Sequence, residues 1–216
     1  MAIGRTRPFP ALKLKKWLDV SLRESGFRNA SLRLSVHWGQ SGEGRLLLFL
    51  TSFESHPKEW YEKGVELRST VSRRPSSRAQ DTQAKTSQYV SGVLAKLDSA
   101  GAAHELLFLG PQGTVAEGTV SNIFIIKEKC LLTPSVGSGI LRGVTRGIVM
   151  DLARKRKWRV LETTLTRHDV YTADECFITN TSSEALPVVA VDGRRIGDGN
   201  PGPLTRLLGE DFKKLR

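Results

Sequence analysis

One lysine stands at a place where its side chain can leave the surface and take part in chemistry. Lys85 follows a polar and strongly basic stretch, residues 73–83, and opens a segment whose apolar spacing predicts an amphipathic helix. A lysine at such a junction can point into a cleft, where its amine, when neutral, forms a Schiff base with an aldehyde. On position alone, however, a lysine among 33 basic residues is an ordinary solvated group.

Glu117 is the acid whose position is most informative. It belongs to a turn-like Glu-Gly pair that leads into an apolar strand over residues 120–126. An acid at the mouth of a buried strand can pair with a protonated ring nitrogen and keep a pyridinium ring charged, so that the ring draws electrons. The simpler interpretation is a solvated turn carboxylate, because Glu is rarely buried without a partner.

Two further segments offer groups that bind anions. The glycine-containing loop 138–143 runs into a predicted helix, where the amides of Val144 and Thr145 and the Thr145 hydroxyl can donate to a phosphate. Residues 179–183 are small and polar between two apolar runs, a turn that suits a phosphate oxygen on one side and a substrate carboxylate on the other. Helix capping and a plain Ser/Thr loop are the structural alternatives. Together with Lys85 and Glu117, these groups can hold pyridoxal 5'-phosphate and carry out amine chemistry on it.

The order and spacing of these parts resemble the class IV aminotransferase family. These are fold-type IV pyridoxal-phosphate enzymes, including branched-chain and D-amino-acid aminotransferases and aminodeoxychorismate lyase. The resemblance covers about residues 83–208, and its matching pieces are the Lys85 helix, Glu117-Gly118 with residues 121–124, residues 132–134, 139–146, 173–177, 186–188 with 191–193, and 199–205.

The resemblance implies a role for each candidate residue. Lys85 would be the Schiff-base lysine and proton shuttle, Glu117 the partner of the ring nitrogen, and Leu141 the residue packed on a cofactor face. The phosphate would be held by Val144, Thr145 and Thr181.

Three more residues complete the predicted site. Asn122 is expected to orient the Glu117 turn rather than touch substrate, and the amides of Thr181 and Ser182 are expected to bind a substrate carboxylate. Tyr89, one turn after Lys85, either approaches the phenolic oxygen of the cofactor or packs in the core.

The expected fold is α+β, a two-lobed fold-type IV architecture like that of D-amino-acid aminotransferase, with a reduced N-terminal lobe. The expected divisions are an N-terminal lobe over 1–72, a basic linker over 73–84 and a cofactor-binding domain over 85–216. Alternation and periodicity predict helices near 12–22, 57–64, 143–157 and from about 201, and strands over 30–38, 44–52 and 65–72. Family members usually carry a phosphate-binding arginine before the first of these helices; its place falls near Pro10, and Arg7 or Lys13 are the candidate substitutes.

Composition narrows the setting. The chain of 216 residues has no apolar run of the ~18 residues that a membrane span requires, and Met1–Pro10 lacks a signal-peptide core, so we expect a cytoplasmic protein. Cys130 and Cys176 lie in strand-like segments and are expected to be reduced core thiols. The four histidines show no ligand spacing, so no metal site is expected.

The expected activity is pyridoxal-phosphate-dependent transfer of an amino group between a small or branched-chain amino acid and a 2-oxo acid, in a homodimer. Aminodeoxychorismate lyase is the alternative within the fold, and a catalytically impaired relative is another, which the presence of Lys85 and Glu117 disfavours. The net charge of +11 raises a third alternative, a basic nucleic-acid-binding protein. Zinc-finger spacing and aromatic-interleaved basic motifs are absent from the sequence, and the charges spread through the whole chain.

Overall fold

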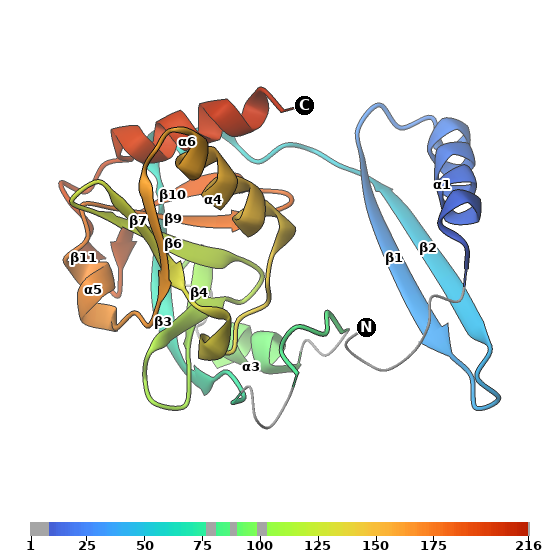
Figure 1. The fold of residues 1–216 in the computed structure, drawn as a ribbon, viewed down its shortest axis with the longest axis horizontal. Coiled ribbons are helices and arrows are strands. Elements are labelled where there is room, and N and C mark those ends of the chain that lie inside the picture. Colours follow the sequence, from blue (N-terminus) through green and yellow to red (C-terminus); the bar gives the residue numbers. More distant parts are fainter. Residues whose placement is uncertain (1–8, 77–80, 87–89, 99–102, 216) are drawn as a thin grey trace. The chain divides into compact units, whose positions relative to one another are not determined.

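A computed structural model describes residues 9–76, 81–86, 90–98 and 103–215. The chain forms two compact units, one ending at Ser55 and one beginning at His56. Each unit is described by itself (Figure 1).

The first unit is a helix followed by a two-stranded hairpin. Helix α1 (Ala11–Ser25) ends at Gly26, whose φ of 67° is the left-handed conformation that a glycine adopts readily at a helix C-terminus. Strands β1 (Ala30–Trp38) and β2 (Gly44–Ser52) pair antiparallel from end to end. None of the described residues of this unit is buried, so the unit lacks a closed core of its own.

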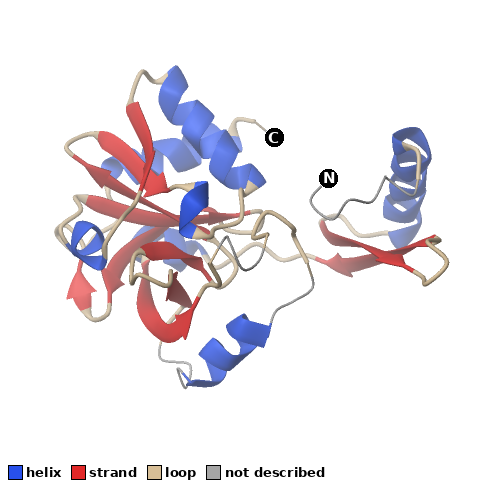
Figure 2. Ribbon diagram, turned by 60° about the horizontal axis from the view of Figure 1, so that its bottom comes forward, coloured by secondary structure: helices blue, strands red, loops and turns tan. Residues whose placement is uncertain are grey.

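The second unit is built on a mixed sheet, in which the described strands run β5-β4-β3-β10-β9-β6-β7-β8, with β11 beside β10. The strands are β3 (Val65–Arg73), β4 (Glu105–Leu109), β5 (Val115–Gly118), β6 (Asn122–Lys127), β7 (Cys130–Pro134), β8 (Arg159–Thr163), β9 (Glu175–Asn180), β10 (Glu184–Val191) and β11 (Arg194–Arg195). Its helices are α2 (Lys58–Lys63), α3 (Val90–Asp98), the 3-10 turn η1 (Val136–Ser138), α4 (Val144–Lys155), α5 (Arg167–Tyr171) and α6 (Pro203–Lys213). Figure 2 shows the red strands of this sheet between blue helices.

Strands β4 and β6 consist almost entirely of buried, mostly apolar residues. The described residues of β4 are all buried, as are those of β6 up to Ile126, the pattern of strands covered on both faces. Phe124 of β6 and Phe177 of β9 are cross-strand neighbours whose rings stack with centroids 5.0 Å apart. Helices α4 and α6 lie next to each other and pack on the face of the sheet that carries these two rings (Figure 1). Their apolar side chains form a core with Phe124 and Phe177.

The boundary between the units differs from the linker at residues 73–84 that the sequence suggested. Strand β3 lies between β4 and β10 and pairs in parallel with both, which places it inside the second unit. Asp192, directly after β10, accepts hydrogen bonds from the Ser69 amide at 2.6 Å and from the Tyr171 hydroxyl at 2.6 Å. A strand held by two neighbours and a carboxylate belongs to the same folded body as they do.

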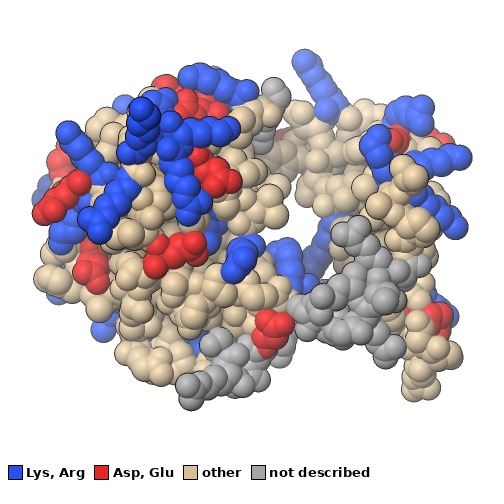
Figure 3. All heavy atoms as spheres, viewed as in Figure 1, with Lys and Arg blue, Asp and Glu red and all other residues tan. Residues whose placement is uncertain are grey.

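The excess positive charge is interspersed with acidic groups on the face of the second unit seen in Figure 3. On α4 and α6, Arg154 pairs with Asp151, and Asp211 pairs with both Arg156 and Lys214. These pairs break up the positive surface over the two helices, a different arrangement from the unbroken basic face that binds nucleic acid.

Candidate active site

Glu117 is the centre of the site. Its side chain is buried, with 8% exposed. One carboxylate oxygen forms an ion pair with Arg74, and the other accepts hydrogen bonds from the Leu141 amide at 3.0 Å and the Asn122 side-chain amide at 3.2 Å. Asn122 also donates to the Leu141 carbonyl at 2.9 Å. The structure thus brings three residues predicted from the sequence, Glu117, Asn122 and Leu141, into one hydrogen-bonded cluster.

Burial and charge act in opposite directions on Glu117. Burial raises the pKa of this carboxyl above its ordinary value, while the Arg74 cation and the Leu141 amide lower it and offset only part of the effect. A carboxylate with a raised pKa and a fixed cation is poised to share a proton with a bound group.

Arg74 is a site residue that the sequence analysis did not identify, since it fell within the basic stretch interpreted as a linker. It directly follows β3, and its amide donates to the Leu109 carbonyl at 2.9 Å, continuing the pairing with β4. Its guanidinium lies 5.8 Å from the centre of the Phe108 ring. The only available signal was its place at the end of a predicted strand.

Asn122 also marks the place where helix α4 meets the sheet. A Cβ added at Gly143, the residue before α4, would lie 2.2 Å from the Asn122 side-chain oxygen, so the approach requires glycine. Of the first two helical residues, Val144 is 80% exposed and Thr145 only 6%. The free N–H groups of the first turn therefore lie next to the Glu117 cluster.

The turn that contains Thr181 lies at the same edge of the sheet. Asn122 begins β6 opposite Thr179 near the end of β9, and Thr181 follows two residues later. Thr181 and Ser182 are exposed. The Asn180 side-chain oxygen accepts from the Ser182 amide at 2.9 Å and the Ser183 amide at 2.6 Å. The Ser182 amide, predicted to bind a substrate carboxylate, would have to leave this bond in order to do so.

Lys85 is exposed and lies before the helix that it was expected to open. The described part of α3 begins at Val90, and Tyr89 lies outside the described residues. The turn before Lys85 is attached to the loop of Leu141, because the Thr82 hydroxyl donates to the Ile140 carbonyl at 3.3 Å. This hydrogen bond connects the segment that precedes Lys85 to the loop of Leu141. Of the substitutes for a phosphate arginine, Arg7 lies outside the described residues, and Lys13 lies over the Trp17 ring at 5.0 Å within the first unit.

These groups fit pyridoxal 5'-phosphate by their chemistry. The buried carboxylate suits a protonated ring nitrogen, the start of α4 suits a phosphate, and Lys85 supplies an amine for the aldehyde. The Thr179 hydroxyl beside Asn122 is fully buried and has no hydrogen-bond partner among the described residues. A buried orphan hydroxyl at this edge is a polar group that a bound ligand or water can satisfy.

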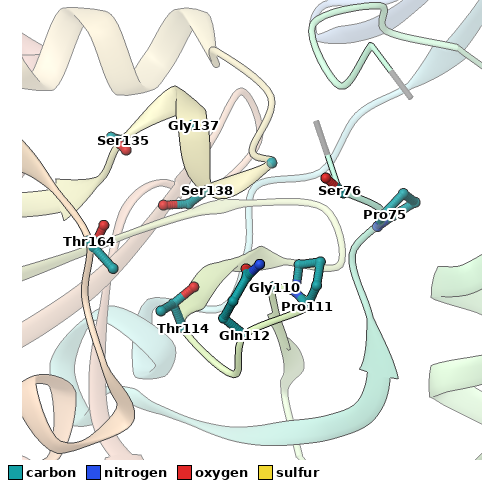
Figure 4. A pocket seen from close by; sticks show the side chains of 11 residues that line it. Pro75, Ser76, Gly110, Pro111, Gln112, Thr114, Ser135, Gly137, Ser138 and Thr164 are labelled. Atoms are coloured by element: carbon teal, nitrogen blue, oxygen red, sulfur yellow. The ribbon is translucent and has the colours of Figure 1, made fainter. Parts of the chain in front are cut away.

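The second unit also contains a polar pocket of about 710 Å³ (Figure 4). It is formed by the β4–β5 turn, the residues around η1 and the segment after β3, and its lining is Pro75, Ser76, Gly110, Pro111, Gln112, Thr114, Ser135, Gly137, Ser138, Gly139 and Thr164. This lining has no charged side chain and includes none of the predicted site residues, so it offers no counter-ion for a phosphate.

The remaining polar residues give no second centre in the described part of the chain. There, His, Cys, Asp and Glu form no group of three or more suited to a metal ion. Cys130 and Cys176 are free, and burial raises the pKa of the Cys176 thiol. Among the described residues, no helix is both long and apolar enough to cross a membrane.

Comparison with known proteins identifies the family of the chain. The sequence model of the family described as "Amino-transferase class IV" matches residues 2–191. The chain is 32% identical over 219 residues to the branched-chain-amino-acid aminotransferase of Pseudomonas aeruginosa, covering 96% of this chain and 71% of that protein. It is 37% identical over 216 residues to a putative branched-chain-amino-acid aminotransferase of Methanocaldococcus jannaschii, covering 95% and 75%.

A solved structure shows the same fold. The branched-chain amino acid aminotransferase of Thermobaculum terrenum, in its pyridoxal-phosphate holo-form, superposes with a TM-score of 0.85 at 26% identity, covering 98% of this chain and 72% of that one. The fold and the matched family define the class of protein, a pyridoxal-phosphate-dependent aminotransferase with an α+β fold. The chain belongs to the class IV aminotransferase family. These relatives favour transamination over lyase chemistry and over nucleic-acid binding.

Proposed function

We propose that this enzyme transfers an amino group between a small or branched-chain amino acid and a 2-oxo acid. The names of its relatives support this substrate class. The observation that carries the assignment of the site is the buried Glu117 carboxylate, bound to Leu141 and Asn122 beside the start of α4. When bound, pyridoxal phosphate supplies the carbonyl carbon that receives the amino group and a ring that draws electrons from the reacting carbon.

The predicted site residues have different roles in this proposal. Lys85 would hold the cofactor through its amine and, once that amine is free, would accept and return the proton of the substrate α-carbon. Glu117 would keep a proton at the ring nitrogen, and Leu141 would pack against the ring. The phosphate is held by Val144, Thr145 and Thr181, and the substrate carboxylate by Thr181 and Ser182.

A borohydride experiment tests the role of Lys85. We expect wild-type protein mixed with pyridoxal phosphate to be fixed by borohydride at Lys85, as seen by peptide mass mapping, and Lys85→Ala to remain unlabelled. Lys155→Ala, which removes an exposed lysine at the end of α4, is the matched control and is expected to label normally. Labelling that maps to a different lysine would contradict the assignment.

We further propose that the enzyme is a homodimer and acts in the cytoplasm, as the sequence analysis expects. A dimer is supported by the apolar side chains that α3 exposes, since a row of such residues is usually covered. They are Val90, Val93, Leu94 and Leu97, which are 63%, 54%, 52% and 72% exposed.

A further inference from the structure

Gln83 joins the segment of Lys85 to the loop of Leu141. Its side-chain nitrogen donates to the Ile140 carbonyl at 2.7 Å, and its side-chain oxygen accepts from the Arg142 amide at 3.2 Å. One side chain thus binds the residue before Leu141 and the residue after it.

Leu141 itself is held from the other direction. Its amide donates to Glu117 and its carbonyl accepts from Asn122. Residues 140–143 lie outside any helix or strand, and so do the described residues 81–86. Side-chain hydrogen bonds therefore fix these two segments where a backbone ladder is missing.

We propose that Gln83 is a positioning residue that sets the place of Lys85 relative to Glu117, through Leu141. Gln83 and Lys85 are two residues apart, so their Cα atoms are separated by at most about 7 Å. A shift of Gln83 therefore also displaces Lys85, because only one residue separates them. This inference rests on the proposed function, because it concerns the covalent attachment at Lys85.

Binding of two ligands distinguishes two explanations for Gln83: that it positions Lys85, or that it only supports the loop of Leu141. Pyridoxal phosphate can bond covalently to Lys85, whereas pyridoxamine phosphate has no aldehyde and binds without that bond. In Gln83→Met, which keeps the length of the side chain but loses both of its hydrogen bonds to the loop of Leu141, we expect the affinity of the apoprotein for pyridoxal phosphate to fall about tenfold. The affinity for pyridoxamine phosphate should change by less than about threefold, because Leu141 keeps its bonds to Glu117 and Asn122.

A second variant and a control protect the test. Gln83→Glu keeps an oxygen for the Arg142 amide but loses the donor to Ile140, and it should show the same selective loss. Gln112→Met alters an exposed glutamine of the β4–β5 turn and should leave both affinities unchanged.

Each result decides between the explanations. An equal fall for both ligands would show that Gln83 supports only the loop, and unchanged affinities would show that it does nothing for the site; either outcome overturns the inference. If wild-type protein takes no borohydride label at Lys85, the proposed function fails first and the inference with it. If wild-type protein is labelled at Lys85, but the Gln83 variants do not lose more affinity for pyridoxal phosphate than for pyridoxamine phosphate, only the inference fails.

Discussion

At the scale of single residues, Glu117 and Arg74 form the electrostatic centre of the site. A buried carboxylate is costly unless it is paired, and Glu117 has a guanidinium and two amide donors around it. Burial raises the pKa of Glu117, and the Arg74 cation offsets part of that rise. In the proposed function, this balance between burial and the Arg74 cation sets how readily Glu117 would hold a proton at the ring nitrogen.

The first residue-scale prediction separates the acid from the lysine. Glu117→Gln should still bind pyridoxal phosphate but lose turnover by orders of magnitude, because a neutral amide no longer holds the proton at the ring nitrogen. Single-turnover kinetics with an amino donor measure this loss. Glu128→Gln, at an exposed glutamate of the β6–β7 turn, is the control with unchanged rates, and equal rates for both variants would rule out the role given to Glu117.

The second prediction concerns pH. The pKa of Glu117 is raised by burial, so its contribution to the stability of the apoprotein is complete at low pH and is lost as the pH rises through the raised value. Arg74→Gln removes the cation that lowers this pKa, so the pKa of Glu117 rises further. The loss of folding stability then continues to a higher pH than in wild type. The variant should therefore match wild type most closely below about pH 4.3, and the gap should widen as the pH increases.

At neutral pH we expect the Arg74→Gln gap to reach about 3 kcal/mol, the low end for breaking a buried pair, because the Arg74 side chain is 25% exposed. Urea denaturation of both apoproteins between pH 4 and 8 measures it. A gap that stays constant over this range would mean that Glu117 and Arg74 are not coupled.

At the scale of elements, the site lies where the N-terminus of helix α4 meets the start of β6 and the end of β9. Gly143 brings α4 against Asn122, and the pairing of β6 with β9 brings the Thr181 turn to the same edge. The amides of the first turn of α4 carry a partial positive charge that favours an anion. This geometry is typical of a phosphate site.

The element-scale prediction tests this phosphate site against helix capping alone. Thr145→Val and Thr181→Val should each weaken binding of pyridoxal phosphate by roughly 1.5–3 kcal/mol, the value of a hydrogen bond to a charged group. Pyridoxal, which lacks the phosphate, should bind the variants as it binds wild type. Titration of each apoprotein with both ligands gives the affinity gap, which must shrink in the variants; a gap of the original size would leave capping as the explanation.

The helix and strand pattern was largely predictable, because short-range periodicity determines it. Strands over 30–38 and 44–52 are confirmed as β1 and β2, and the helices expected near 57–64 and 143–157 are confirmed as α2 and α4. Local sequence did not reveal the position of β3, since its partners β4 and β10 lie far along the chain. The contacts of Arg74 and Gln83 were hidden for the same reason: each is made with a residue more than 40 positions away in the sequence.

At the scale of the whole molecule, the prediction concerns the exposed row on α3. If this row forms the interface of a homodimer, Leu97→Glu should convert the dimer to monomer, because burying an unpaired carboxylate at an apolar interface is costly. Sedimentation velocity measures the change. Leu215→Glu alters another exposed leucine, beyond α6, and should leave the dimer intact. A wild-type protein that sediments as a monomer, or a Leu97→Glu dimer, would reject this interface.

The place of β3 between two parallel neighbours also has a consequence for synthesis on the ribosome. The hydrogen bond between Ser69 and Asp192 spans 123 residues, so β3 leaves the ribosome long before the chain around β10 exists. At about 5–20 residues per second, the delay is roughly 6–25 seconds. During that time the backbone edge of β3 that later pairs with β10 has no partner strand, and the apolar side chains of Val65 and Leu67 lack part of the cover they have in the folded protein. We therefore expect the nascent chain to be prone to aggregation in the interval before β10 emerges.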